Sequence, residues 1–208
     1  KPDHVASRAV TLLLADPRGR DERVRNLITS DRSAITLQPV LDHLHRRRQA
    51  WLDPFLDGSK ISGRFLSGKL VYLPPVTAGF HRWLPRQQHA LAALIRRLGA
   101  DKGHAQVTRT AEIQRLAALP VTTVADFEQF LRDPEIPVVE AALAALVWID
   151  TPSDALPILL EHTAGDRARV AMYAVPRVAR FIPADTLATT LIGLLDDTPR
   201  KLTVRKEA

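Results

Sequence analysis

Hydrophobic residues along most of the chain recur at intervals of three and four positions, the spacing of one face of an α-helix. Alternation with a period of two, which indicates a strand, is sparse. In the C-terminal half the helical pattern stops at Asp133-Pro134, Asp150-Thr151-Pro152 and Phe181-Ile182-Pro183. Proline disfavours helix both at its own position and at the one before it. We therefore expect an all-α protein whose helices end at these stops.

The N-terminal half shows the same periodicity with one long interruption. Its predicted helices cover residues 4–15, 21–28, 39–55 and 85–98. Residues 57–83 contain four glycines and the pair Pro74-Pro75, and they show no period. Glycine and proline favour turns, so this stretch is predicted to be an irregular insertion with a short hairpin that includes residues 70–73. The chain then divides into N-terminal helices over 1–56, the insertion over 57–83 and helical repeats over 84–208.

Equivalent hydrophobic positions in the C-terminal half repeat at a nearly constant interval. Ile113, Leu143, Ala174 and Ala208 occupy matching places in successive second helices, at spacings of 30, 31 and 34 residues. The clearest copies cover residues 133–149, 166–182 and 198–208. In each copy a valine precedes the matching position by four residues, as Val139, Val170 and Val204 do. A period of this length built from helix pairs indicates an α-solenoid.

This pattern over residues 105–208 resembles the HEAT-repeat family. The resemblance implies a right-handed α–α superhelix of helical hairpins, in which the second helices line an extended concave surface. The whole chain, including the stretch Phe80-His81-Arg82-Trp83 before Pro85, is also similar to large bacterial proteins that carry a HEAT array. Because the helical pattern is still running at Ala208, we expect the repeats to be truncated there and the chain to be a fragment of such a protein.

The composition fits a globular protein of the cytoplasm. The 208 residues are 46% hydrophobic and 25% charged, which excludes intrinsic disorder. The longest apolar run, residues 141–149, is far shorter than the roughly twenty residues that cross a bilayer. No membrane association is therefore expected. The absence of cysteine excludes disulfides, cysteine zinc sites and thiol nucleophiles.

The charge is unevenly distributed. Residues 1–100 carry 17 lysines and arginines against 8 aspartates and glutamates, whereas residues 101–208 carry 12 against 15, within a net charge of +6. A basic half can bind nucleic acid because lysine and arginine release counterions from phosphates. It is equally compatible with arginines scattered over several helix faces.

Two local patterns suggest chemistry, but neither is complete. Gly63 to Lys69 fits the G-x-x-x-x-G-K pattern of a phosphate-binding loop, but Leu70 stands where serine or threonine must bind magnesium. A glycine-rich turn is therefore the favoured interpretation. Asp42 and His45 share a helix face, but the arginines at 46–48 would repel a cation. We predict no metal and no cofactor.

The HEAT resemblance raises one enzymatic alternative, because some HEAT-like bacterial proteins are DNA glycosylases for alkylated bases. Such an enzyme needs a carboxylate among aromatic and arginine side chains, which Asp150, Trp148, Arg177 and Arg180 could supply. However, Asp150 is also an ordinary helix stop, and Trp148 is predicted to pack between repeats. The residue pattern of those enzymes does not map onto this chain, so no catalytic residue is assigned and the protein is predicted not to be an enzyme.

The leading functional prediction is an interaction scaffold that holds a protein partner on the second-helix surface. Its candidate binding residues there are Glu140, Arg169 and Arg177, together with Arg167 and Arg205. The alternative is a nucleic-acid binder that uses basic and aromatic residues at the insertion. These residues are Arg64, Lys69, Arg82, Trp83 and Arg86. A competing interpretation is that the rings at the insertion fill a hydrophobic seam while the arginines extend into solvent.

Overall fold

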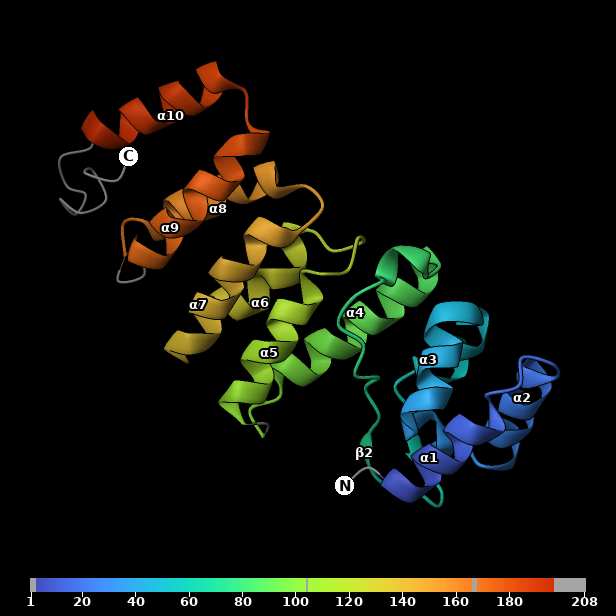
Figure 1. Cartoon of the computed structure of the whole chain (residues 1–208). Helices are drawn as coiled ribbons and strands as arrows, with labels where there is room; N and C mark the ends of the chain where they lie inside the picture. Colours follow the sequence, from blue (N-terminus) through green and yellow to red (C-terminus); the bar gives the residue numbers. More distant parts are fainter. Residues whose placement is uncertain (1–2, 104, 166–167, 197–208) are drawn as a thin grey trace. The chain divides into compact units, whose positions relative to one another are not determined.

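The structure is a computed structural model of the chain, described over residues 3–103, 105–165 and 168–196. It is mostly helical, and within those ranges its only sheet is one two-stranded hairpin (Figure 1). The prediction of an all-α protein is confirmed. The chain forms two compact units, Lys1–Leu94 and Ile95–Ala208, so the predicted insertion at 57–83 belongs to the first unit. No described helix is both long enough and apolar enough to cross a membrane.

The first unit consists of short helices followed by the hairpin. Its elements are α1 (His4–Leu13), α2 (Arg20–Ser30), the 3-10 helix η1 (Arg32–Thr36), α3 (Gln38–Arg47), the 3-10 helix η2 (Gln49–Phe55), β1 (Lys60–Ser62), β2 (Ser67–Val71), the 3-10 helix η3 (Phe80–Arg82) and the start of α4 (Pro85–Ala100). The connection between α1 and α2 passes through Gly19, which has a φ of +64°. Arg20 and Arg23 donate hydrogen bonds to backbone carbonyls between Leu14 and Asp16, which satisfies groups beyond the end of α1.

The predicted helix over 39–55 is wrong in its second half. The α-helix ends at Arg47, Arg48 leaves helical geometry, and the chain continues as a 3-10 helix. Pro54 explains part of this break, because proline in an α-helix interior lacks an N–H and clashes with the carbonyl four residues earlier. The tighter turn still buries Leu52 and Phe55.

The hairpin confirms the predicted short strand pair within the insertion, although β2 begins at Ser67 rather than Leu70. β1 and β2 are antiparallel, with Lys60 opposite Val71 and Ser62 opposite Ser67, and their register is irregular between those pairs. Gly68 has a φ of +70° and lies so close to Ser62 that an added Cβ would be 2.8 Å from its Cβ. Glycine is therefore required where the strands come together.

The second unit contains the rest of α4 and a series of helix pairs. Its further elements are α5 (Gln106–Leu116), the 3-10 helix η4 (Val124–Phe127), α6 (Glu128–Leu131), α7 (Ile136–Ala145), the 3-10 helices η5 (Leu146–Trp148) and η6 (Pro152–Ala155), α8 (Leu156–His162), α9 (Ala168–Val178), the 3-10 helix η7 (Ala179–Phe181) and α10 (Ala184–Asp196). α6 packs against α7 and α8 against α9, while α7 also packs against both α5 and α9 (Figure 1). The matching positions Ile113, Leu143 and Ala174 are all buried in these contacts between helices.

One detail of the second unit differs from the predictions. Trp148 was expected to pack between repeats, but 63% of it is exposed. It ends η5 four positions after the exposed Ala144, so it lies on the same outer side as that residue. Asp166, Arg167 and the predicted copy at 198–208, including Arg205, lie outside the described residues.

A buried arginine ties three segments of the second unit together. Arg109 on α5 is only 1% exposed. Its Nε donates to the carbonyl of Gly99 over 2.7 Å, and its guanidinium forms ion pairs with Asp133 and, at 2.9 Å, with Glu135. The Asp133-Pro134 stop therefore also supplies a carboxylate that compensates a buried charge.

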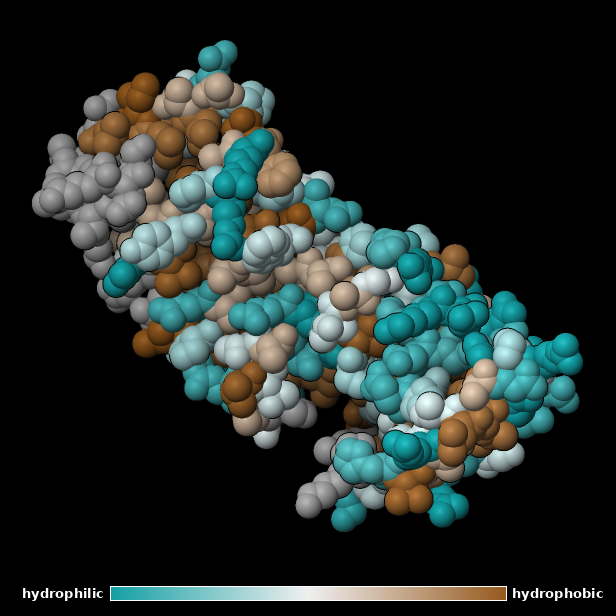
Figure 2. Space-filling view, viewed as in Figure 1, coloured by the Kyte–Doolittle hydropathy of each residue, from teal (hydrophilic) through white to brown (hydrophobic). Residues whose placement is uncertain are grey.

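The last described helix, α10, has no fully buried side chain among those described. Ile192 and Leu195 are exposed, and Figure 2 shows hydrophobic residues over this helix.

Candidate functional site: the exposed faces of α7 and α9

The outer surface of α7 is formed by residues four positions apart. Glu140 is partly exposed, while Ala144 and Trp148 are exposed. The opposite side of the helix buries Val138 and Leu143. Since residues four apart lie on one face of a helix, packing of the apolar side fixes where the other face points.

α9 presents a similar row of side chains. Arg169, Tyr173 and Arg177 are exposed at intervals of four residues, whereas Ala174 and Val178 on the other side are buried. Since α7 and α9 pack against each other, their exposed rows form neighbouring parts of one surface. We call this surface the α7–α9 face, composed of Glu140, Ala144, Trp148, Arg169, Tyr173 and Arg177.

Both arginines of the α7–α9 face lie over aromatic rings. The guanidinium of Arg177 is 4.7 Å from the ring centre of Trp148, which links α9 to the end of η5. The guanidinium of Arg169 is 5.4 Å from the ring centre of Tyr173, and its Nε donates to the tyrosine hydroxyl over 3.1 Å. Cation–π contact of this kind holds an arginine in place while its remaining N–H donors stay available to a carboxylate.

The two aromatic rings of the α7–α9 face are largely open to solvent. Trp148 is 63% exposed and Tyr173 is 57% exposed. Neither Arg169 nor Arg177 forms an ion pair with a carboxylate in the described part of the chain. Tryptophan, tyrosine and arginine are the residues that contribute most to binding energy at protein interfaces. The arrangement can therefore receive an apolar group on the rings and an acidic group beside them.

The structure brings together the three candidates that the sequence predicted on the second helices, Glu140, Arg169 and Arg177. Sequence reasoning missed Tyr173 altogether and assigned Trp148 to the interior. The signal for Tyr173 was present, because it lies four residues from both arginines of α9. A signal for the exposure of Trp148 was also present, because it lies eight residues after Glu140, on the same helix face.

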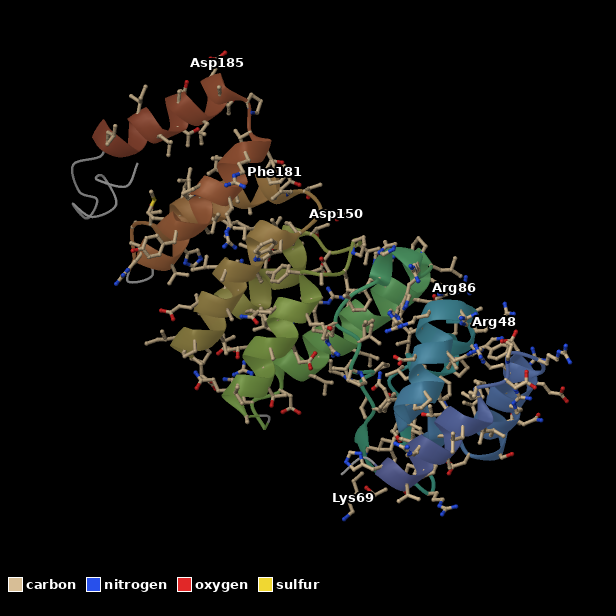
Figure 3. All side chains as sticks on the ribbon, in the orientation of Figure 1. Arg48, Lys69, Arg86, Asp150, Phe181 and Asp185 are labelled. Atoms are coloured by element: carbon tan, nitrogen blue, oxygen red, sulfur yellow. The ribbon has the colours of Figure 1, made fainter. Side chains whose placement is uncertain are left out.

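Further exposed polar and aromatic residues lie at one end of the α7–α9 face. Asp150, Arg180 and Phe181 are all exposed, and the segments that carry them meet where η6 packs against η7 (Figure 3). A carboxylate that stabilises a cationic transition state works best where water is excluded. The exposure of Asp150 does not favour that role.

The candidates at the insertion are placed differently from one another. Trp83 is 3% exposed, so its ring is not presented at the surface. It packs edge-on against Phe80, with ring centres 5.4 Å apart. Both rings fill the hydrophobic seam under the insertion, as the competing interpretation of this region expects.

The four basic candidates at the insertion do not form a continuous patch with Trp83. Arg64 is exposed in the hairpin turn over the ring of Phe65, and Arg82 is exposed on η3. Arg86 is paired with Asp53 at 2.9 Å. Lys69 is exposed on β2 and lies well apart from Arg86 in Figure 3.

Neither of the local patterns with suggested chemistry has the geometry that chemistry requires. Gly63 to Lys69 forms the hairpin turn and the start of β2, whereas a phosphate-binding loop leads into a helix. Asp42 accepts a hydrogen bond from Gln38 over 2.9 Å, and His45 accepts one from the indole N–H of Trp83. No group of three potential metal ligands occurs among the described residues.

An acid–base pair lies elsewhere in the first unit. The ring of His43 is buried, and its Nε2 lies 2.8 Å from Asp21. A hydrogen bond from Arg48 lowers the pKa of the Asp21 carboxyl. Burial lowers the pKa of His43, and this outweighs the raising effect of Asp21, so the ring stays neutral near pH 7.

Acidification is expected to destabilise the first unit through His43. His43 has a pKa near 6.5 in the unfolded chain and a lower pKa in the folded protein. At pH values between these two, the unfolded chain binds more protons than the folded protein. This part of the stability is complete above the unfolded pKa and is lost as the pH falls toward the folded pKa. The slope is at most about 1.4 kcal/mol per pH unit. NMR titration, assigned with His43→Gln, should give a pKa below 6.5, and a value of 6.5 or above would contradict this account.

Comparison with known proteins finds no relative of this chain. No known protein family matches the chain, and no curated protein or solved structure matches it either. The functional proposal therefore rests on the geometry of the α7–α9 face.

Proposed function

We propose that the protein is a non-enzymatic interaction scaffold that binds a protein partner through the α7–α9 face. The observation that carries the proposal is the pairing of exposed aromatic rings with arginines that have no carboxylate partner among the described residues. Arg177 with Trp148 and Arg169 with Tyr173 provide two such pairs on adjacent helices. The proposal places Glu140 beside them as a polar contact that sets the orientation of the partner.

The packing of the second unit supports a HEAT-like solenoid as the framework for this scaffold. α5, α7 and α9 pack in succession, and α6 and α8 each pair with the helix that follows. In a right-handed superhelix of helical hairpins the second helices would line the inner surface. α7 and α9 are the second helices of two successive pairs, so the α7–α9 face would belong to that surface.

The chemistry of the face favours a partner segment that carries acidic and apolar side chains. Carboxylates complement the open N–H donors of Arg169 and Arg177, and a leucine or similar group complements the rings of Trp148 and Tyr173. Glu140 would repel a segment that is acidic throughout, so the preferred sequence alternates acidic residues with neutral or basic ones.

Selection from a displayed random peptide library on the full chain tests this function. We expect the enriched peptides to contain aspartate or glutamate next to large apolar residues. A selected peptide should then bind Trp148→Ala or Arg177→Gln at least tenfold more weakly than the wild type, because these side chains form the centre of the contact.

Arg132→Gln is the matched control for charge. Arg132 is also an exposed arginine of the second unit, but it lies at the end of α6, 3.6 Å from Glu128. Its replacement should leave the affinity for the peptide unchanged. Failure to enrich any peptide, or equal binding to Trp148→Ala and the wild type, would refute the scaffold function at this face.

Binding of nucleic acid is the alternative function that would replace this proposal. Binding to single- and double-stranded DNA and RNA is measured at two salt concentrations. Micromolar or tighter affinity that falls steeply with salt would favour the basic first unit as a nucleic-acid binder, because counterion release produces that dependence. Replacement of Arg64, Lys69 and Arg82 by alanine would then show whether the insertion forms the site.

A further inference from the structure

The first unit contains a pocket of about 450 Å³ between α3 and the segment that leads into η3. The lining residues that matter for its chemistry are Gln38, Asp42, His45, Arg46, Thr77 and Arg82. The pocket is separate from the α7–α9 face, and nothing in the proposed scaffold function uses it. Its volume suits a small molecule rather than a polymer segment.

Two unpaired guanidinium groups line this α3 pocket. Arg46 and Arg82 are exposed, and neither forms a hydrogen bond or an ion pair through its side chain with any described residue. Arginines close to them in sequence are different, because Arg48 is paired with Asp21 and Arg86 with Asp53. Arg46 and Arg82 thus leave two guanidinium groups available to a ligand at this pocket.

His45 adds a neutral hydrogen-bond donor. The indole N–H of Trp83 donates to Nδ1 of His45 over 2.9 Å. An indole nitrogen can only donate, so Nδ1 is the acceptor and the ring proton is on Nε2. Burial, together with Arg46 and Arg82, lowers the pKa of His45 against the effect of Asp42. The ring is thus held as a neutral donor at Nε2, and Trp83 fixes its orientation.

The backbone of the facing segment supplies more donors. The N–H groups of Thr77 and Ala78 are at exposed residues and have no acceptor among the described residues. Gly79 follows with a φ of +81°, and a Cβ at that position would lie 3.1 Å from Nε2 of His45. The segment is anchored by the buried side chain of Phe80, so the pocket exists before any ligand arrives. Guanidinium groups, an N–H of histidine and open backbone amides are the groups that bind phosphate.

α3 also carries an acceptor about one helical turn from Arg46. Asp42 accepts from Gln38 through Oδ1, and Oδ2 accepts no hydrogen bond within the described chain. One turn of helix rises about 5.4 Å, a distance that a pentose or hexose phosphate can bridge. A hydroxyl bound at Asp42 and a phosphate bound at Arg46 would thus belong to the same molecule.

We propose that the α3 pocket binds a small phosphorylated sugar, with its phosphate between Arg46, Arg82 and His45 and a hydroxyl on Asp42. Calorimetric titration of the full chain with ribose 5-phosphate, inorganic phosphate and ribose tests this assignment. Ribose 5-phosphate should bind most tightly, inorganic phosphate more weakly, and ribose without measurable heat. Arg82→Gln and Arg46→Gln should each weaken the binding of both phosphates at least tenfold.

Two further variants separate a built site from general attraction of anions. Arg47→Gln removes the same charge from the next position of α3, which does not line this pocket, and it should leave both affinities unchanged. Asp42→Asn should weaken ribose 5-phosphate but not inorganic phosphate, since only the sugar reaches that carboxylate. The proposal is overturned if millimolar ribose 5-phosphate gives no saturable heat, or if Arg47→Gln and Arg46→Gln weaken binding equally. It is also overturned if Asp42→Asn changes neither ligand. These results leave the peptide experiments on the α7–α9 face unaffected.

Discussion

Arg109→Ala is expected to lower the free energy of unfolding of the second unit by about 3–5 kcal/mol, the usual cost of breaking a buried ion pair from one side. The substitution removes the hydrogen bond to the carbonyl of Gly99 and leaves Asp133 and Glu135 without their counter-charge. It also leaves a cavity where a large buried side chain had been. Urea denaturation followed by circular dichroism measures the loss.

Arg132→Ala is the control for Arg109→Ala. The side chain of Arg132 is 81% exposed, and its pair with Glu128 spans one helical turn. Exposed pairs of that kind contribute about 0.5 kcal/mol or less. A second comparison, Arg109→Lys, keeps the charge but cannot reproduce the planar set of donors, so it should remain clearly destabilising. Equal stability of Arg109→Ala and Arg132→Ala would show that the buried network does not hold the helices together.

Gly63→Ala is expected to destabilise the first unit by about 2–3 kcal/mol. A Cβ at this position would overlap Oδ1 of Asp31 and lie only 2.5 Å from Oγ of Ser33. Asp31 cannot easily move away, because it accepts hydrogen bonds from the backbone N–H of Ser33 at 2.8 Å and of Arg64 at 3.0 Å. The estimate corresponds to the loss of two or three hydrogen bonds at about 1 kcal/mol each.

Hydrogen exchange provides the local measurement for Gly63→Ala. The amides of Arg64 and Phe65, which donate to Asp31 and Ser33, should exchange faster than in the wild type. Gly193→Ala is the contrasting change, since nothing lies within 4 Å of the added methyl group. In the last turn of α10 it should stabilise the helix by about 0.5–1 kcal/mol. Unchanged exchange at Arg64 in Gly63→Ala would mean that the turn can accommodate a side chain.

The hydrogen bonds at Asp31 also affect the behaviour of the first unit in acid. Partial burial alone would raise the pKa of Asp31, but hydrogen bonds from Ser33 and from the amide of Arg64 outweigh this and lower it. A carboxyl with a lowered pKa stabilises the fold above its unfolded pKa, and this contribution is lost as the pH falls through the folded value. Asp31 and His43 thus act in the same direction, with Asp31 contributing at lower pH.

The sequence predicted local structure well wherever the pattern of a single segment is decisive. The predicted helices at 4–15 and 85–98 correspond to α1 (His4–Leu13) and α4 (Pro85–Ala100), because hydrophobic periodicity and nearby prolines define them. The hairpin follows from the glycines around a short apolar run. The predicted helix over 39–55 failed in its second half, because periodicity does not show that the chain leaves helical geometry at Arg48.

The candidate site was only partly visible in the sequence. Arg169 and Arg177 followed from helical phase, because positions opposite a buried row must face outward. The exposed position of Trp148 was not predicted, since a tryptophan in an apolar run is usually interior. Trp83 was expected at a binding surface, yet its ring is in the core and its N–H fixes His45.

The amino-acid sequence by itself determined that the protein is helical, where most helices begin and end, and that the first half is basic. Those properties depend on residues a few positions apart. Tertiary structure alone decided that Gly63 meets Asp31, that Arg109 meets Asp133, and that Arg46 is left without a partner. The first two contacts join residues more than twenty positions apart. The third depends on whether any surrounding residue places an acceptor within reach of Arg46. Burial and pairing are properties of the packed chain, and no local pattern encodes them.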